Sequence, residues 1–174
     1  MKLYPIKHDL PGTLWCGPAA LSACTGFSTS YITCMIKKHT GERKVSGVRA
    51  HVLAKVAREL GFHLCVVFDW FDQQVKLGHS TPLKPTLAKF TRDFRASLRE
   101  FPVIVNVTGH YVVVHGRTFV DNQVRRPVRL SKAPGRRRRV KKAWKVIPLS
   151  NCKLWATPVY SGIAQLPTCT IPAK

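Results

Sequence analysis

The first third of the chain carries apolar residues at helical spacing. This pattern predicts helices at about 18–24 and 30–39, and a third between Ser46 and Gly61. The hydroxyls of Ser28-Thr29-Ser30 and of Ser46 can accept hydrogen bonds from the first free N–H groups of the second and third helices. A glycine follows each helix, and glycine is well suited to ending one.

Runs of β-branched residues replace the helical spacing farther along. They predict strands at about 63–68, 102–107, 110–115 and 117–121, and an amphipathic helix at 86–99 whose Lys and Arg side chains face solvent. Because the helices come first and strands joined by short turns come later, we expect an α+β fold. In this fold the N-terminal helices pack on an antiparallel sheet.

Composition adds a strong positive charge to this picture. The 174-residue chain is 45% hydrophobic, enough to build one core, but it carries 29 Lys and Arg against 8 Asp and Glu, a formal net charge of +21. Such an excess indicates a polyanionic partner, most often nucleic acid and less often an anionic membrane surface.

The charge is concentrated in a predicted basic hairpin or loop at about 123–145. A solvated face is the ordinary interpretation of a charge run, but four adjacent arginines repel one another without counter-ions, which favours anion binding. Aromatic residues are not interleaved with the charges, so we expect contact with phosphates rather than base stacking. An acidic protein neighbour is the alternative. The expected nucleic-acid-binding residues are Arg125, Arg126, Arg129, Lys132, Arg136, Arg137, Arg138, Arg139, Lys141 and Lys142.

Beyond this segment the apolar pattern returns. A strand is predicted at about 144–149, which completes one domain over residues 1–149. Residues 150–174 are expected to form a C-terminal arm that packs on the domain or on a partner, so subunits of a larger assembly are possible partners.

Signals of several other protein classes are absent. The N-terminus has no apolar run typical of a signal peptide, and no apolar stretch reaches the roughly 18 residues of a membrane span. We expect no membrane association and a location in the cytoplasm or inside a virion or nucleoprotein particle. The six cysteines show no metal-ligand spacing, so neither a metal nor a cofactor is expected, and Cys24, Cys34 and Cys65 are expected in the core.

Cys16 is the first candidate for chemistry. Gly17 and Pro18 follow it, and proline is favoured in the first turn of a helix. Cys16 would then lie at the helix N-terminus, where free N–H groups and the helix dipole stabilise a thiolate. The alternative is a small buried cysteine under Trp15.

His110 is the second candidate. It opens a β-branched run, and the next strand ends at Asp121 and Asn122. Neighbouring strands can place a carboxylate or amide beside an imidazole, the arrangement that holds a general base in one tautomer. A structural role for His110 or His115 is the alternative.

Taken together, these segments resemble the papain-like cysteine peptidase superfamily, in particular the bacteriocin-processing (double-glycine leader) peptidases. The similarity covers roughly residues 8–122 and rests on the sequences at 16–21, 109–116 and 120–122. It implies a papain-like fold, with Cys16 as nucleophile, His110 as base and Asp121 or Asn122 as the orienting residue.

One departure from that family concerns the oxyanion hole. The family usually places a Gln several residues before the cysteine, whereas the first Gln of this chain is Gln73. The remaining candidate donors are the Cys16 backbone N–H and the side chains of Trp15, Thr13 and His8. Loss of one such donor typically lowers the rate about 10²–10³-fold.

Two functions from different classes follow. The first is a cysteine peptidase or amidase acting on a peptide or protein, either by hydrolysis or by acyl transfer, and carrying a nucleic-acid-binding loop. The second is a catalytically idle scaffold of the same fold, serving as a basic structural protein of a nucleoprotein assembly. The intact Cys, His and Asp/Asn set favours the first, and the missing Gln and high charge favour the second.

Overall fold

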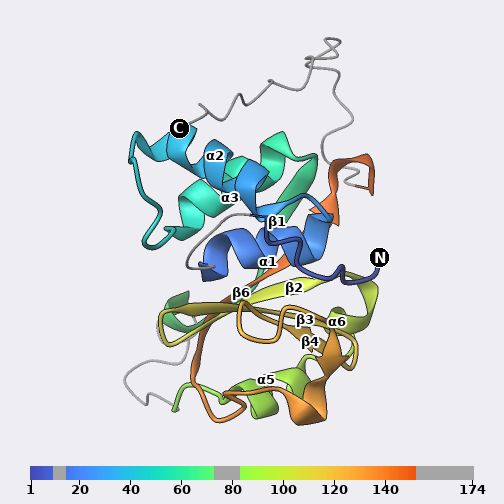
Figure 1. Ribbon diagram of the computed structural model, residues 1–174. Helices are drawn as coiled ribbons and strands as arrows, with labels where there is room; N and C mark the ends of the chain where they lie inside the picture. The colour runs from blue at the N-terminus through green and yellow to red at the C-terminus, as the bar shows by residue number, and fades with distance from the viewer. Residues whose placement is uncertain (10–14, 73–82, 152–174) are drawn as a thin grey trace.

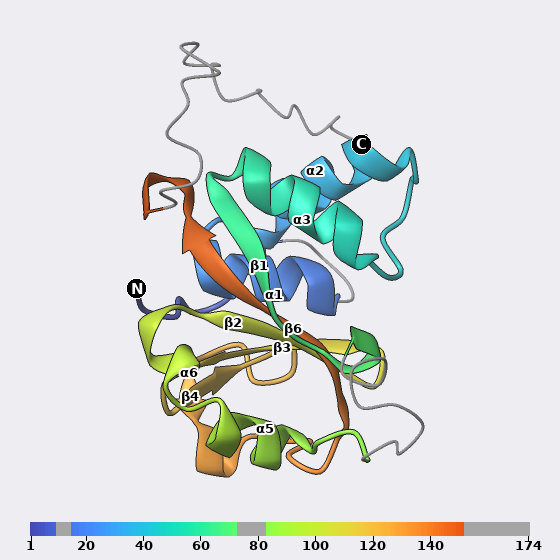
Figure 2. The ribbon, with the colours of Figure 1, turned by 180° about the vertical axis from the view of Figure 1, so that it is seen from behind.

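A computed structural model describes residues 1–9, 15–72 and 83–151. Three N-terminal helices form a layer on one face of an antiparallel sheet (Figure 1): α1 (Cys16–Thr25), α2 (Thr29–Thr40) and α3 (Ala50–Glu59). Two short helices lie on the other face (Figure 2): α5 (Leu87–Asp93) and α6 (Ser97–Glu100). The α+β class predicted from the sequence is confirmed.

The described part of the sheet has six strands: β1 (Phe62–Asp69), β2 (Val103–Val107), β3 (His110–His115), β4 (Thr118–Val120), β5 (Val128–Arg129) and β6 (Val140–Pro148). Their order is β1-β6-β2-β3-β4-β5, and every neighbouring pair is antiparallel. The strands predicted at about 102–107, 110–115 and 117–121 are present as β2, β3 and β4, and each pairs with the next. β6 returns to lie between β1 and β2, so β1 joins the meander only through β6.

Local signals predict the first two helices well. α1 ends at Gly26, whose φ of 80° is left-handed, and α2 begins after Ser28, whose hydroxyl accepts from the Tyr31 N–H. The predicted cap of the third helix is wrong. α3 begins only after Arg49, because residues 42–49 form a loop that crosses the N-terminus of α1 instead of joining the helix.

Two further boundaries differ from the prediction. The single helix expected at 86–99 is divided at Phe94, which closes α5, and the chain then restarts as α6. The last strand begins at Val140 rather than near 144, since its backbone pairs with β1 on one side and β2 on the other. Lys141 and Lys142 therefore belong to the sheet and not to a loop.

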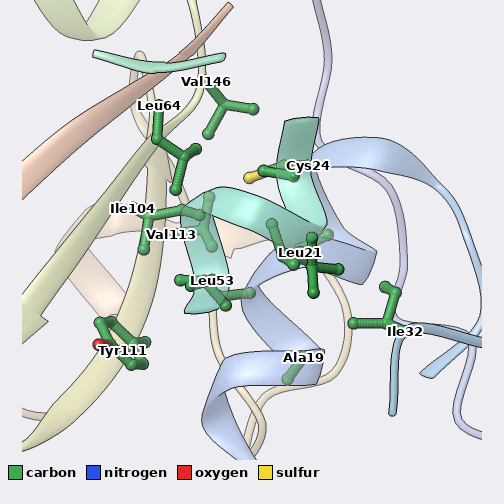
Figure 3. Close-up of a cluster of buried hydrophobic side chains, with 14 of the residues drawn as sticks. Ala19, Leu21, Cys24, Ile32, Leu53, Leu64, Ile104, Tyr111, Val113 and Val146 are labelled. Carbon is green, nitrogen blue, oxygen red and sulfur yellow. The ribbon is translucent and has the colours of Figure 1, made fainter. Parts of the chain in front are cut away.

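Apolar clusters on both faces of the sheet hold these layers together. In the cluster under the N-terminal helices, Leu21 of α1 and Leu53 of α3 lie against Val113 of β3 (Figure 3). On the other face, Phe90 of α5 stacks on Phe94 with ring centroids 4.7 Å apart. Burial of each such leucine or phenylalanine contributes about 1.5–3 kcal/mol to the free energy of folding, so the helices are held firmly against the sheet.

Only one of the three cysteines predicted to lie in the core does so. Cys24 is fully buried, as predicted, and burial raises the pKa of its thiol. Cys34 and Cys65 are half-buried rather than part of the core. The predicted C-terminal arm begins at the edge of the described chain, and its residues from 152 on lie outside the described ranges. None of the described helices is long and apolar enough to cross a membrane.

Candidate active site

Cys16 is the first residue of α1. Trp15 before it is extended, with ψ of 144°, and the Ala19 N–H donates to the Trp15 carbonyl to close the first turn. Residues 17–24 are all buried, so the core fixes the helix while the half-buried thiol stays at its N-terminal end. The thiol thus lies where free N–H groups favour negative charge.

The loop 42–49 approaches the start of α1 so closely that position 17 has room only for a glycine. A Cβ at this position would lie 2.8 Å from Val48 Cγ2, which is closer than van der Waals contact allows. The absence of a side chain lets the loop 42–49 pack directly against the start of α1. This contact forms one wall beside Cys16.

His110 is positioned by the tight turn between β2 and β3. Its two turn residues, Thr108 and Gly109, both have left-handed backbones, with φ of 45° and 78°, and Val107 pairs with His110 across the hairpin. Two consecutive left-handed residues are typical of a type I′ turn, whose backbone twist matches the twist of the two strands it joins. Thr108 is the only non-glycine residue with positive φ in the described chain, and such strain often accompanies a functional site.

Asp121 follows β4 directly and is only 3% exposed. Its Oδ1 accepts hydrogen bonds from the N–H groups of Gln123 and Val124, at 3.0 and 2.8 Å. Its Oδ2 lies 3.4 Å from His110 Nε2. The carboxylate is therefore fixed by the backbone and faces the imidazole, which leaves Nδ1 of His110 as the nitrogen available to the thiol. Asn122, the other orienting candidate, lines the adjoining cavity instead.

The thiol and the imidazole each shift the pKa of the other. Burial raises the pKa of the Cys16 thiol, but the hydrogen bond to the His110 side chain and a second one from the Tyr111 N–H outweigh burial. The thiol pKa is held below its usual value. For His110, the hydrogen bond to Asp121 is the largest cause and the hydrogen bond to Cys16 the next. Together they raise the pKa of the imidazole to about 9.

Asp121 completes this coupling. Burial alone would raise the pKa of its carboxyl, but the His110 hydrogen bond and the two backbone N–H donors hold it below the usual range. A buried carboxylate that stays charged favours the protonated imidazole, and the protonated imidazole favours the thiolate. The three groups are thus arranged to hold a thiolate–imidazolium pair.

A cavity of about 660 Å³ opens at this pair. Its lining includes Trp15 and Cys16 at the start of α1, His110 and Asn122, and residues of the loop 42–49. Sequence reasoning missed that loop and the Tyr111 N–H. Tyr111 directly follows His110 in the motif and could have been considered, whereas nothing in the polar stretch 42–49 indicated a cavity wall.

The three side chains predicted as oxyanion-hole donors differ in where they stand relative to the cavity. Trp15 lines the cavity. His8 lies elsewhere, with its Nδ1 3.2 Å from Thr29 Oγ1 at the start of α2, and it is not part of the cavity wall. Thr13 is outside the described residues.

The ten basic residues predicted to bind nucleic acid come from several elements and loops of the fold. Lys142 is half-buried and forms an ion pair with Asp69, its partner across β1 and β6. Arg125 lies beside the N-terminal segment, where its carbonyl accepts from the Ile6 N–H. Arg129 and Arg136 meet near α5.

The basic hairpin or loop predicted at about 123–145 is attached to the fold at its centre. The N–H groups of Leu87 and Ala88 donate to the carbonyls of Arg138 and Arg136, at 2.9 and 3.0 Å. The loop backbone is therefore joined to the start of α5, although the side chains of residues 136–139 remain exposed.

No family model matches this sequence, and a comparison with curated proteins finds no significant relative. Within the ranges 1–9, 15–72 and 83–151, no three His, Cys, Asp or Glu side chains gather as metal ligands. A function for this chain must accordingly be argued from the geometry of Cys16, His110 and Asp121.

Proposed function

We propose that the protein is a cysteine peptidase or amidase of papain-like type. The observation that carries the proposal is that Cys16 of α1 and His110 of β3 meet at one open cavity, with Asp121, just after β4, facing His110 from behind that cavity wall. A nucleophile, a base within reach of it and a third group that orients the base are the parts that acyl-transfer chemistry requires.

In the proposed reaction, the Cys16 thiolate attacks the carbonyl carbon of a bound amide. The tetrahedral oxyanion forms beside the N-terminus of α1, where the Cys16 N–H is one of the donors left free by the helix. As the C–N bond breaks, the His110 imidazolium gives its proton to the departing amine. A thioester on Cys16 remains.

The thioester is resolved by a second attack. Neutral His110 takes a proton from water, the hydroxide adds to the thioester carbonyl, and the carboxylic acid leaves as the Cys16 thiolate and the imidazolium are restored. An amine in place of water would give acyl transfer with the same proton movements. The cavity of about 660 Å³ has room for either acceptor beside the acyl group.

The alternative of a catalytically idle scaffold makes no use of these couplings. It would not require a buried Asp121 to carry charge, nor would it require His110 to share hydrogen bonds with both Cys16 and Asp121. Burying an ionised carboxylate is costly unless its partners compensate, so such an arrangement is better explained by chemistry than by packing.

A peptide library derived from a digested proteome tests the proposal, because it offers the site peptides of many different sequences at once. Under reducing conditions, new peptide termini generated by the full-length protein should share a preferred sequence around the cleaved bond, as detected by mass spectrometry. Added hydroxylamine should yield hydroxamates of the same acyl groups, because it intercepts the thioester. Neither new termini nor hydroxamates would appear if the site is idle.

A further inference from the structure

A second cavity lies on the face of the sheet opposite α1. It has a volume of about 570 Å³ and is bounded by α5, the turn between β3 and β4, and the segment around 130–136. An adjoining cavity of about 520 Å³ shares Arg117 and Arg136 with it. We call the two together the basic groove, and its cations are Lys89, Arg92, Arg95, Arg117, Arg129 and Arg136.

The fold assembles this groove from segments distant in the sequence. Arg117 is placed by the β3–β4 turn, and its carbonyl accepts from the Leu130 N–H at 2.7 Å. Arg129 lies on β5, which pairs with β4 at Thr118. The hydrogen bonds that join residues 136–138 to α5 bring Arg136 to the same place. All six cationic side chains are exposed.

Almost no negative charge offsets these cations. All eight acidic residues of the chain fall within the described ranges, none of them lines the groove, and Asp93 is the one paired with its cations. It pairs with Lys89 at 2.8 Å and with Arg92 at 3.4 Å. Within the described chain the remaining groove cations, Arg95, Arg117, Arg129 and Arg136, form no ion pair with an acid. The fold therefore holds like charges close together, and a bound anion would reduce their mutual repulsion.

The chemistry of the lining indicates which anion fits. The four unpaired cations are arginines, whose forked guanidinium binds phosphate oxygens in pairs. Among the described residues no aromatic side chain lines the groove, so it offers phosphate contacts and no surface on which bases could stack. The exposed Arg137, Arg138 and Arg139 continue the positive charge beyond it, which suits a polymer better than a single phosphate ion.

From these observations we infer that the basic groove binds the sugar-phosphate backbone of a nucleic acid, without regard to base sequence. The groove is separate from the cavity at Cys16. His110 begins β3 and Arg117 follows its end, so about 17–20 Å of strand lies between them, and the two cavities open on different faces. The inference therefore does not rest on the proposed peptidase activity.

Salt-dependent binding of a labelled mixed-sequence oligonucleotide, followed by fluorescence anisotropy, tests the groove. The triple variant R95S/R117S/R129S removes three exposed cations that have no acidic partner in the described chain. Each lost phosphate contact should reduce the slope of log K against log salt by about 0.7–0.9, so the variant should lose about 2 to 3 units of slope. Affinity at moderate salt should fall with it.

The matched control is R43S/R125S/R126S, which removes the same charge from exposed positions outside the groove. Its slope should remain within about one unit of the wild-type slope. Three results would overturn the inference: wild-type binding by the groove variant, an equal loss of slope in the control, or tighter binding of polyglutamate than of the oligonucleotide. The last result would assign the groove to an acidic protein.

Discussion

Replacing Cys16 with alanine should abolish turnover while leaving the fold intact. In sites where nucleophile, base and orienting group act together, removal of the nucleophile typically lowers kcat by about 10⁶-fold. The thiol is only half-buried and its helix is anchored by residues 17–24, so we expect the free energy of unfolding to change by no more than about 1 kcal/mol. Cleavage of the peptide library and a thermal melt measure the two quantities.

Cys65→Ala is the matched control for that experiment. Cys65 is also a free, half-buried cysteine, but it lies on β1 and takes no part in the cavity. Its replacement should leave cleavage unchanged. Residual cleavage by Cys16→Ala at the wild-type rate would mean that another group performs the reaction or that a contaminating protease does.

Asp121→Asn should lower the rate about 10²–10⁴-fold without disrupting the chain around it. The amide oxygen can still accept from the N–H groups of Gln123 and Val124, so the turn after β4 keeps its hydrogen bonds. What is lost is the negative charge facing His110. The imidazole is then less well stabilised in its protonated form and less well fixed in its tautomer.

The pH dependence gives this variant a signature that a structural role would not produce. The hydrogen bond to Asp121 is the largest cause that raises the pKa of His110 to about 9. In the wild type, kcat/KM should rise as the thiolate forms and fall as the imidazolium loses its proton near pH 9. In Asp121→Asn the falling limb should move to lower pH. A smaller kcat/KM with an unmoved falling limb would contradict the assigned role.

Sequence patterns locate Cys16 and His110 because the signals for their positions are local. The glycine and proline after Cys16 place it at a helix start, and the turn and β-branched run around His110 place it at a strand start. The choice between Asp121 and Asn122 is not available from the sequence. It depends on which side chain the turn after β4 directs toward the imidazole, and the two backbone N–H bonds to Asp121 decide it.

Non-local pairing accounts for most of what the sequence does not reveal. β6 lies between β1 and β2, and this order brings Lys142 opposite Asp69, which neutralises a lysine that the charge pattern assigns to nucleic-acid contact. Likewise Ser46 has the chemistry of a cap, but its loop is used to cover the start of α1. No local propensity encodes either outcome.

The position of the basic groove also depends on contacts between segments that are distant in the sequence. The sequence shows that positive charge is dense after Asn122, and its helical pattern assigns the cations of α5 to solvent. Hydrogen bonds between residues 136–138 and α5 join the two sets into one surface. Charge density could therefore be predicted from composition, whereas the position of the groove could not.

The rate at which iodoacetamide alkylates Cys16, measured across pH by peptide mass spectrometry, tests the thiolate–imidazolium pair most directly. In the wild type the rate should reach half its maximum below pH 9, the ordinary value for a thiol, and Cys16 should react faster than Cys65 at neutral pH. In His110→Ala the midpoint should move to higher pH, because burial remains and the hydrogen bond to the imidazole is gone. Superimposable profiles in wild type and His110→Ala, in a variant that melts like the wild type, would show that no such pair exists.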